Sequence, residues 1–203
     1  NACSGIDIYN HFFLLMDECH QLIKDVDYRT DIVLPMNDFF RFKSKALVSA
    51  TPIGFSDPRF KEFETVEVSA DYDYRQEIAV THTYNIYKAI SEYLGNHTEE
   101  TVCFFVNSVV MIYSIMKQFG ILEDSTVYCA PKSRLKLKNE YSFDNAYNDW
   151  NADTMKKYNF FTGRFFTAFD LDLPYQPDLV MVTDPYNSEY TILDIDTDSI
   201  QIC

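Results

Sequence analysis

The chain has few residues that break regular structure, and it has no long apolar run. Its 203 residues include only five glycines and seven prolines, which argues against low-complexity sequence and long flexible linkers. No stretch of about 18 apolar residues occurs. The amino-terminus also lacks a basic region followed by an apolar core. The sequence therefore predicts no membrane-spanning segment, no membrane partner and no secretory signal.

Cysteines and basic residues are also scarce. The five cysteines are an odd number and show no paired spacing, which predicts free thiols in a reducing, cytoplasmic location and no zinc site. There are 17 Lys and Arg residues against 31 Asp and Glu residues, so the net charge is −14. Proteins that bind nucleic acid are usually basic somewhere. Overall charge therefore counts against such a partner, and only motifs or a local basic stretch can support one.

What the chain does contain is a series of short apolar runs separated by polar segments that can form helices. This rhythm is typical of an α/β protein with a parallel sheet. The runs expected to be strands span residues 12–16, 46–48, 65–68, 102–106, 126–129, 158–161 and 179–182. Apolar residues at helical spacing predict helices over 83–94 and 108–119, the second capped by Ser108 and ended by Gly120.

A segment without periodicity, residues 69–77, predicts a connection between two lobes. We therefore expect a first lobe over residues 1–68 and a second lobe over 69–203. The first lobe has only three of the expected strands. That number is too small for a complete nucleotide-binding fold, in which the phosphate-loop strand and helix come first.

Two groups of polar residues follow directly on expected strands. Asp17 and Glu18 end one apolar run, and Ser49 and Thr51 follow another. Side chains at the carboxyl ends of parallel strands face the crevice in which α/β proteins bind ligands. Carboxylates there can hold Mg²⁺ and polarise an attacking water, and nearby hydroxyls can hydrogen-bond to those carboxylates. Either group alone also fits an ordinary turn.

The tetrapeptides Asp-Glu-Cys-His, from Asp17, and Ser-Ala-Thr-Pro, from Ser49, resemble motifs II and III of superfamily-two helicases of the DEAD/DEAH-like kind. The resemblance implies tandem RecA-like lobes, ATP and Mg²⁺ as cofactors, and nucleic acid as partner, with DNA favoured over RNA. It also implies roles for single residues. Asp17 would hold the metal through water, and Glu18 would activate the attacking water. His20 would lie between the nucleotide and motif III, with its residues Ser49 and Thr51, and couple hydrolysis to movement of the lobes.

The second lobe carries weaker resemblances to later motifs of the same family. The strand that runs into Ser108 resembles motif IV. The segment from Thr162 through Arg164 to Asp170 resembles motif V, although Ala168 stands where that motif has glycine. The resemblance implies that Ser108, Thr162 and Arg164 belong to the nucleic-acid and interlobe surface. It implies that Asp170 helps to order the cleft between the lobes.

Two essential parts of such a motor are missing from these residues. No Gly-x-x-x-x-Gly-Lys-Ser/Thr phosphate loop occurs. Gln201 resembles the first residue of motif VI, but the arginines of that motif do not follow. We therefore expect a fragment of an ATP-dependent helicase or translocase that is inactive by itself. Two alternatives remain open, a non-motor protein-interaction module with a degenerate helicase fold and a metal-dependent phosphohydrolase that uses Asp17, Glu18 and His20.

One basic stretch stands out in this acidic chain. Lys132, Arg134, Lys136 and Lys138 are spaced by two, so they line one side if the segment is extended. In that conformation they predict a track for backbone phosphates of nucleic acid. The alternative is an exposed segment whose lysines serve solubility or protect a sheet edge.

Overall fold

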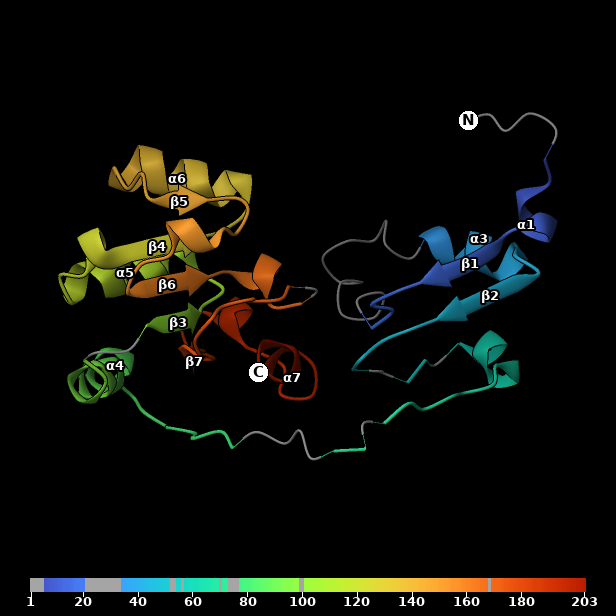
Figure 1. The fold of residues 1–203 in the computed structure, drawn as a ribbon, viewed down its shortest axis with the longest axis horizontal. Coiled ribbons are helices and arrows are strands. Elements are labelled where there is room, and N and C mark those ends of the chain that lie inside the picture. The colour runs from blue at the N-terminus through green and yellow to red at the C-terminus, as the bar shows by residue number, and fades with distance from the viewer. Residues whose placement is uncertain are drawn as a thin grey trace. The chain divides into compact units, whose positions relative to one another are not determined.

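The computed structural model divides the chain into two compact units, unit 1 (residues 1–74) and unit 2 (residues 75–203) (Figure 1). The boundary lies inside the segment 69–77 that lacks periodicity in the sequence. The residues that the structure describes are 6–20, 34–51, 54–55, 57–69, 71–72, 77–98, 101–167 and 169–203. Within these ranges, no helix is both long and apolar enough to cross a membrane.

Unit 1 contains a small parallel sheet. Its described elements are α1 (Ile8–His11), β1 (Phe13–Met16), α3 (Leu34–Arg41), β2 (Ser44–Leu47) and the 3-10 helix η2 (Pro58–Glu62). Strands β1 and β2 pair in parallel, with Phe13 opposite Ser44 and Met16 opposite Leu47. The strands expected at 12–16 and 46–48 are thus confirmed. The strand expected at 65–68 is wrong, because those residues are exposed and pair with no strand among the described residues.

Aromatic rings hold unit 1 together. Phe39 on α3 is fully buried, and its ring lies 6.0 Å from that of Phe63 and 6.3 Å from that of Phe60 on η2. The neighbouring Phe40 ring packs 4.9 Å from Phe60 and carries the Arg59 guanidinium at 3.9 Å over its face. Part of the high aromatic content therefore serves as the core of a small unit.

Unit 2 is an α/β domain with a five-stranded parallel sheet in the order β5-β4-β6-β3-β7. Its elements are α4 (Ile86–Asn96), β3 (Val102–Phe105), α5 (Val109–Gln118), η3 (Leu122–Asp124), β4 (Ser125–Tyr128), α6 (Pro131–Tyr141), β5 (Ala146–Tyr147), η4 (Ala152–Thr154), β6 (Tyr158–Phe161), η5 (Gly163–Phe165), β7 (Asp178–Met181), η6 (Glu189–Thr191) and α7 (Asp198–Ile202). All four strands expected in this part of the chain are confirmed within one residue, and so is the α/β class with parallel sheets.

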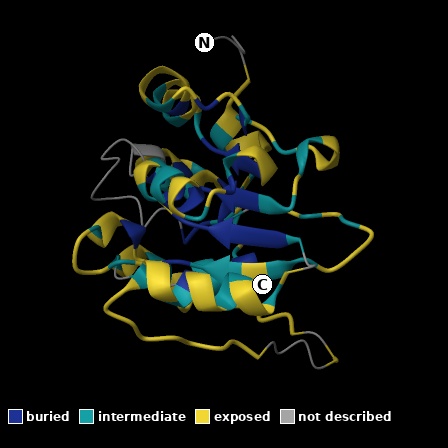
Figure 2. Cartoon of the chain, turned by 90° about the vertical axis from the view of Figure 1, so that its left-hand side faces the viewer, coloured by how far each residue is buried: buried dark blue, intermediate teal, exposed yellow. Residues whose placement is uncertain are grey.

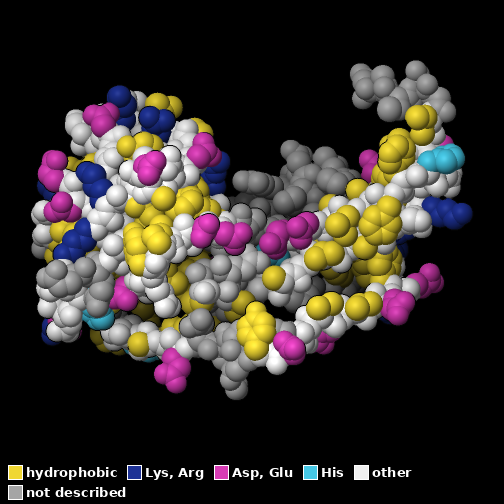
Figure 3. Space-filling model, in the orientation of Figure 1, with side chains coloured by type: hydrophobic (Ala, Val, Ile, Leu, Met, Phe, Trp, Pro, Cys, Tyr) yellow, Lys and Arg dark blue, Asp and Glu magenta, His cyan; other side chains and the backbone are white. Residues whose placement is uncertain are grey.

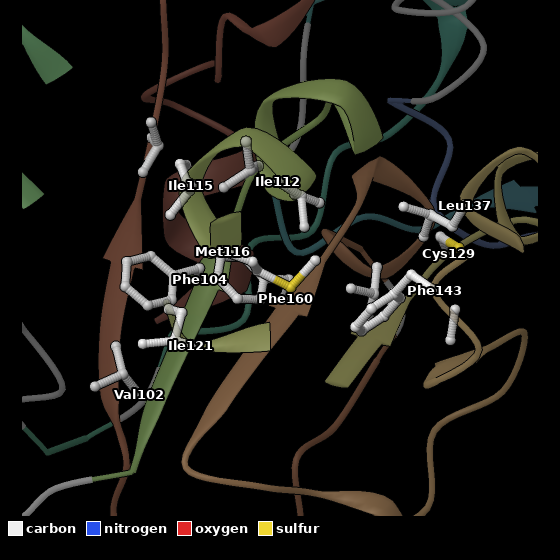
Figure 4. Close-up of a cluster of buried hydrophobic side chains, with 14 of the residues drawn as sticks. Val102, Phe104, Ile112, Ile115, Met116, Ile121, Cys129, Leu137, Phe143 and Phe160 are labelled. Carbon is white, nitrogen blue, oxygen red and sulfur yellow. The ribbon is translucent and has the colours of Figure 1, made fainter. Parts of the chain in front are cut away.

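The three inner strands of unit 2, β4, β6 and β3, are buried on both faces, which is why the sequence shows them as apolar runs. On one face, Val102 and Phe104 of β3 join Phe160 of β6 beneath α4, α5 and α6 (Figures 2 and 4). The rings of Phe104 and Phe160 are stacked with centroids 4.8 Å apart. Met116 of α5 and Leu137 of α6 are buried in the same cluster.

The opposite face is covered by the segment that follows β6 and by α7. Phe105 and Phe161 point to this side, and Phe165, Phe166 and Ile202 pack against them. Phe165 and Phe166 are a bulky pair directly after Arg164. Their burial gives both rings a packing role.

Helix α5 begins and ends where its capping residues predict. The Ser108 hydroxyl accepts a hydrogen bond from the Met111 amide, and Gly120 follows α5 with a φ of +66°, as expected for a helix stop. The helix expected over 83–94 is confirmed as α4, with Asn85 as its cap. By contrast, residues 132–138 are not extended but belong to α6, which Pro131 begins.

Candidate functional site

The parallel pairing of β1 and β2 brings the two polar groups of unit 1 to one edge of the sheet. Backbone hydrogen bonds between these two segments continue past the ends of the strands. The Val48 amide donates to the Met16 carbonyl at 2.9 Å, and the Cys19 amide donates to the Val48 carbonyl at 3.1 Å. The turn that starts at Asp17 therefore lies directly beside the turn that starts at Ser49.

The backbone of Glu18 takes a rare conformation in this turn. Its φ of +49° lies in the left-handed region, which costs a non-glycine residue about 1–3 kcal/mol and persists only where surrounding contacts hold it. One such contact is the 2.8 Å hydrogen bond from the Glu18 amide to Asp17 Oδ1. The turn leaves Asp17 exposed and Glu18 half-buried, and it takes the next residues, Cys19 and His20, into the interior. Such outliers cluster at functional sites.

His20 connects the two groups. Its ring is fully buried, and Nδ1 lies 2.8 Å from Ser49 Oγ and 3.2 Å from Glu18 Oε2. Ser49 Oγ also accepts a hydrogen bond from the amide of Thr51, which is itself buried. One ring nitrogen thus contacts a hydroxyl of one motif and a carboxylate of the other. In a buried network such polar contacts are strong and hold their geometry.

Cys19, between Glu18 and His20, is not a reactive thiol. Burial raises the pKa of its thiol, and the neighbouring charges of Glu18 and Asp17 raise it further. A thiol in this state stays protonated at neutral pH and is a poor nucleophile. Elsewhere in the described chain, no group of three or more His, Cys, Asp or Glu side chains is placed to hold a metal ion.

Asp17 fits a different kind of metal binding, namely the water-mediated contact of Mg²⁺ bound to a phosphate. It is exposed at the strand end, and Oδ1 is engaged by the Glu18 amide, so Oδ2 remains for a metal-bound water. Mg²⁺ keeps several of its waters and needs only one or two carboxylates in addition to substrate phosphates. The residues present therefore fit the cofactor that the resemblance implies.

In unit 2, Asn107 ties together the ends of three strands. It follows β3, and its Oδ1 accepts a hydrogen bond of 3.1 Å from the Gly163 amide after β6. Its Nδ2 donates at 2.9 Å to the carbonyl of Tyr190, in the loop after β7. A Cβ on residue 163 would lie 2.7 Å from Asn107 Oδ1, so a larger residue there would push the Asn107 side chain out of its present position. Asn107 and Tyr190 were not among the predicted site residues.

Of the predicted site residues of unit 2, only some lie beside Asn107. Ser108 lies in the same strand-end group as Asn107, with its Oγ 3.4 Å from the Tyr190 hydroxyl. Thr162 is buried, and its hydroxyl donates to the Tyr128 carbonyl at 3.3 Å, so this hydroxyl is used inside the protein. The Arg164 guanidinium pairs with Asp149 at 3.0 Å on the surface.

The last two predicted residues lie apart from that group. Asp170 is exposed in the segment after η5, and Gln201 is half-buried on α7, near the end of the chain. The hydrogen bonds that join Asn107, Ser108, Gly163 and Tyr190 include neither of these two residues.

The predicted basic track is wrong in its geometry, because α6 is a helix. Residues four apart share a helix face, so the four basic residues form two pairs instead of one row. Lys132 and Lys136 line a cavity of about 640 Å³ that also contacts Asn107, Ser108 and Tyr190. Arg134 is exposed and does not line the cavity, and Lys138 pairs with Asp144 at 3.1 Å. Figure 3 shows basic and acidic side chains interspersed over α6.

The candidate residues therefore form two separate groups, one in each unit. The first is the contact among Glu18, His20 and Ser49, with Asp17 beside it. The second is the cavity beside Asn107. No family model, no curated protein and no solved structure matches the chain. The chemistry of each group is accordingly inferred from its own geometry.

Proposed function

We propose that these residues are part of an ATP-dependent motor of the helicase or translocase type that acts on nucleic acid, DNA more than RNA. In this proposal, unit 1 is part of a first RecA-like lobe and unit 2 is most of a second. The observation that carries the proposal is the position of His20 Nδ1, 2.8 Å from Ser49 Oγ and 3.2 Å from Glu18 Oε2. A coupling residue between motifs II and III needs this pair of contacts.

The roles of the carboxylates follow from their surroundings. Glu18 is half-buried and one of its carboxylate oxygens is held by the His20 ring, so it is oriented as a general base for an attacking water. Asp17 would hold Mg²⁺, which when bound neutralises charge that develops on the phosphates. In this scheme, a movement of the Glu18 carboxylate shifts the His20 ring. The ring in turn moves Ser49 and the loop that follows β2.

The exposed face of β1 supports an incomplete first lobe. Phe13 and Leu15 are 62% and 54% exposed, whereas Leu14 and Met16, on the other face, are half-buried. Parallel sheets are normally covered on both faces, so a further layer of protein on this face would complete the lobe. The same exposure is also expected if the chain is a protein-interaction module without motor activity. A partner protein would then cover Phe13 and Leu15.

A nucleic-acid partner is supported by the Lys132 and Lys136 pair in an otherwise acidic chain. These lysines lie beside Asn107 and Ser108, at the carboxyl end of β3, where α/β sheets bind ligands. A cytoplasmic location also belongs to the proposal. It is supported by the free thiols of Cys19, Cys103, Cys129 and Cys203 in the described chain.

The coupling role of His20 gives a test of the proposal. In the intact protein that contains these residues, we expect His20→Ala and Ser49→Ala to lower the rate of ATP hydrolysis stimulated by single-stranded DNA by about 10–100-fold. The reason is that His20→Ala removes a contact with the Glu18 carboxylate, and a hydrogen bond to a charged group contributes about 1.5–3 kcal/mol. Ser49→Ala removes the other polar contact of the same ring nitrogen. The unstimulated rate is expected to change much less. Steady-state phosphate release with and without DNA measures both rates.

Ser44→Ala is the matched control, because Ser44 is an exposed serine at the start of β2, the strand that precedes Ser49. It should leave both rates unchanged. DNA stimulation that stays at the wild-type level in both His20→Ala and Ser49→Ala would remove the basis for the coupling assignment.

A further inference from the structure

We propose that Tyr190 is a stacking platform for one base of a single strand of nucleic acid whose phosphates contact Lys132 and Lys136. This inference rests on the proposed function and assigns a recognition residue to it. All three side chains line the same cavity of about 640 Å³, between α5, α6 and the loop that carries η6. A cavity of this size accommodates a nucleotide-sized group.

The side chain of Tyr190 is exposed to solvent, and hydrogen bonds hold its position. It is 56% exposed, yet its hydroxyl lies 3.4 Å from Ser108 Oγ and its carbonyl accepts a 2.9 Å hydrogen bond from Asn107 Nδ2. The next residue, Thr191, is fully buried, and its hydroxyl donates to the Ser188 carbonyl at 2.7 Å and accepts from the Asp184 amide at 2.8 Å. An aromatic ring held in this way loses little freedom when a base stacks on it.

Two cations stand beside this ring. Lys132 and Lys136 lie one turn apart on α6, and no carboxylate of the described residues forms an ion pair with Lys132. Lys136 is 4.0 Å from Glu140 on its own helix, an exposed contact that a phosphate can replace. The hydrogen bond from Ser108 lowers the pKa of Tyr190, and the charge of Lys136 acts in the same direction. The charge of Asp184 acts in the opposite direction, so it is the position of the two lysines on the cavity that Tyr190 also lines that supports the phosphate contact.

The combination of ring and lysines identifies the ligand class. Proteins that bind single strands without sequence preference join a positively charged groove to aromatic rings on which bases stack. Here the ring and the lysines line one cavity, at the end of the sheet where ligands bind. A free nucleotide has the same base and phosphate chemistry, so the experiment separates it from a strand.

The test uses the full chain and fluorescence anisotropy with two labelled probes, an oligo-dT strand and an abasic strand of equal length. We expect Tyr190→Leu to weaken binding of oligo-dT by about 5- to 140-fold, because one stacked base contributes that factor, and to leave binding of the abasic strand unchanged. Tyr190→Phe and Tyr190→Trp keep the ring and should bind oligo-dT within about twofold of the wild type. They also show that a loss in Tyr190→Leu is not caused by the lost hydroxyl.

A second variant isolates the phosphate contacts. Lys132→Gln combined with Lys136→Gln should weaken both probes and lower the log–log salt slope by about 0.7 for each lost contact. Lys138→Gln is the matched control, since Lys138 pairs with Asp144 away from the cavity, and it should leave the slope unchanged.

Several results would overturn the stacking role. One is wild-type affinity of Tyr190→Leu for oligo-dT, and another is an equal loss with both probes. Competition by dTMP at concentrations comparable to the strand would identify a free nucleotide as the ligand instead. If the wild-type chain binds oligo-dT but Tyr190→Leu has no effect, only this inference fails. If the wild-type chain and the intact protein bind neither probe, the proposed function fails as well.

Discussion

Replacement of Glu18 by glutamine in the intact protein is expected to lower the rate of ATP hydrolysis by about 10²–10⁴-fold, the usual contribution of a general base. Glutamine keeps the size of the side chain, and its amide still contacts the His20 ring, but it cannot accept a proton from water. Binding of ATP should persist, because Glu18 does not hold the nucleotide in this scheme. Steady-state kcat and an equilibrium measurement of nucleotide affinity separate the two effects.

Glu67→Gln provides the control for this substitution. Glu67 is also a glutamate of unit 1, but it is exposed in a segment without helix or strand, so its replacement should leave kcat unchanged. Wild-type turnover in Glu18→Gln would show that Asp17 and Glu18 are not the hydrolytic carboxylates. The left-handed backbone at Glu18 would then need another explanation.

The second large effect concerns stability. Phe160→Ala should lower the free energy of unfolding of unit 2 by about 3–5 kcal/mol, the usual cost of removing a buried aromatic ring. Phe160 is fully buried in the centre of the sheet, where its ring stacks on Phe104 and lies in one cluster with Met116. Neighbours on both adjacent strands hold the backbone in place, so the cavity cannot collapse completely.

Urea unfolding monitored by circular dichroism measures this change. Tyr186→Ala removes an aromatic ring that is almost fully exposed, and it should shift the free energy of unfolding by no more than about 0.5 kcal/mol. A loss below about 1 kcal/mol in Phe160→Ala would mean that the two core faces do not pack around β6 as described.

The inner strands of unit 2, β3, β4 and β6, were predictable because burial on both faces makes them apolar runs. Helix α6 was not, because Leu137 is its only buried residue and its basic residues alternate in a way that mimics a strand. At residues 65–68 the sequence predicted a strand that the structure does not contain. The Val residues of this segment favour a strand, but strand formation needs a neighbour, and no local pattern reveals whether one exists.

The candidate site was predictable to a similar degree. That Asp17 and Ser49 lie near one another follows from adjacent parallel strands. The left-handed φ of Glu18 does not follow, since a bend of this kind has no sequence signature outside glycine and asparagine. The link among Asn107, Gly163 and Tyr190 joins residues 56 and 83 positions apart. Contacts of that range depend on strand order, which the apolar runs alone do not determine.

The most direct test of the motor assignment is ATP hydrolysis, measured by phosphate release with Mg²⁺ and with or without single-stranded DNA. The intact protein should hydrolyse ATP, and DNA should stimulate the reaction. The 203-residue chain alone should show no turnover, because it lacks the phosphate loop whose amides and lysine hold the triphosphate. An intact protein that fails to hydrolyse ATP would contradict the assignment, and so would turnover by the 203-residue chain that Glu18→Gln abolishes.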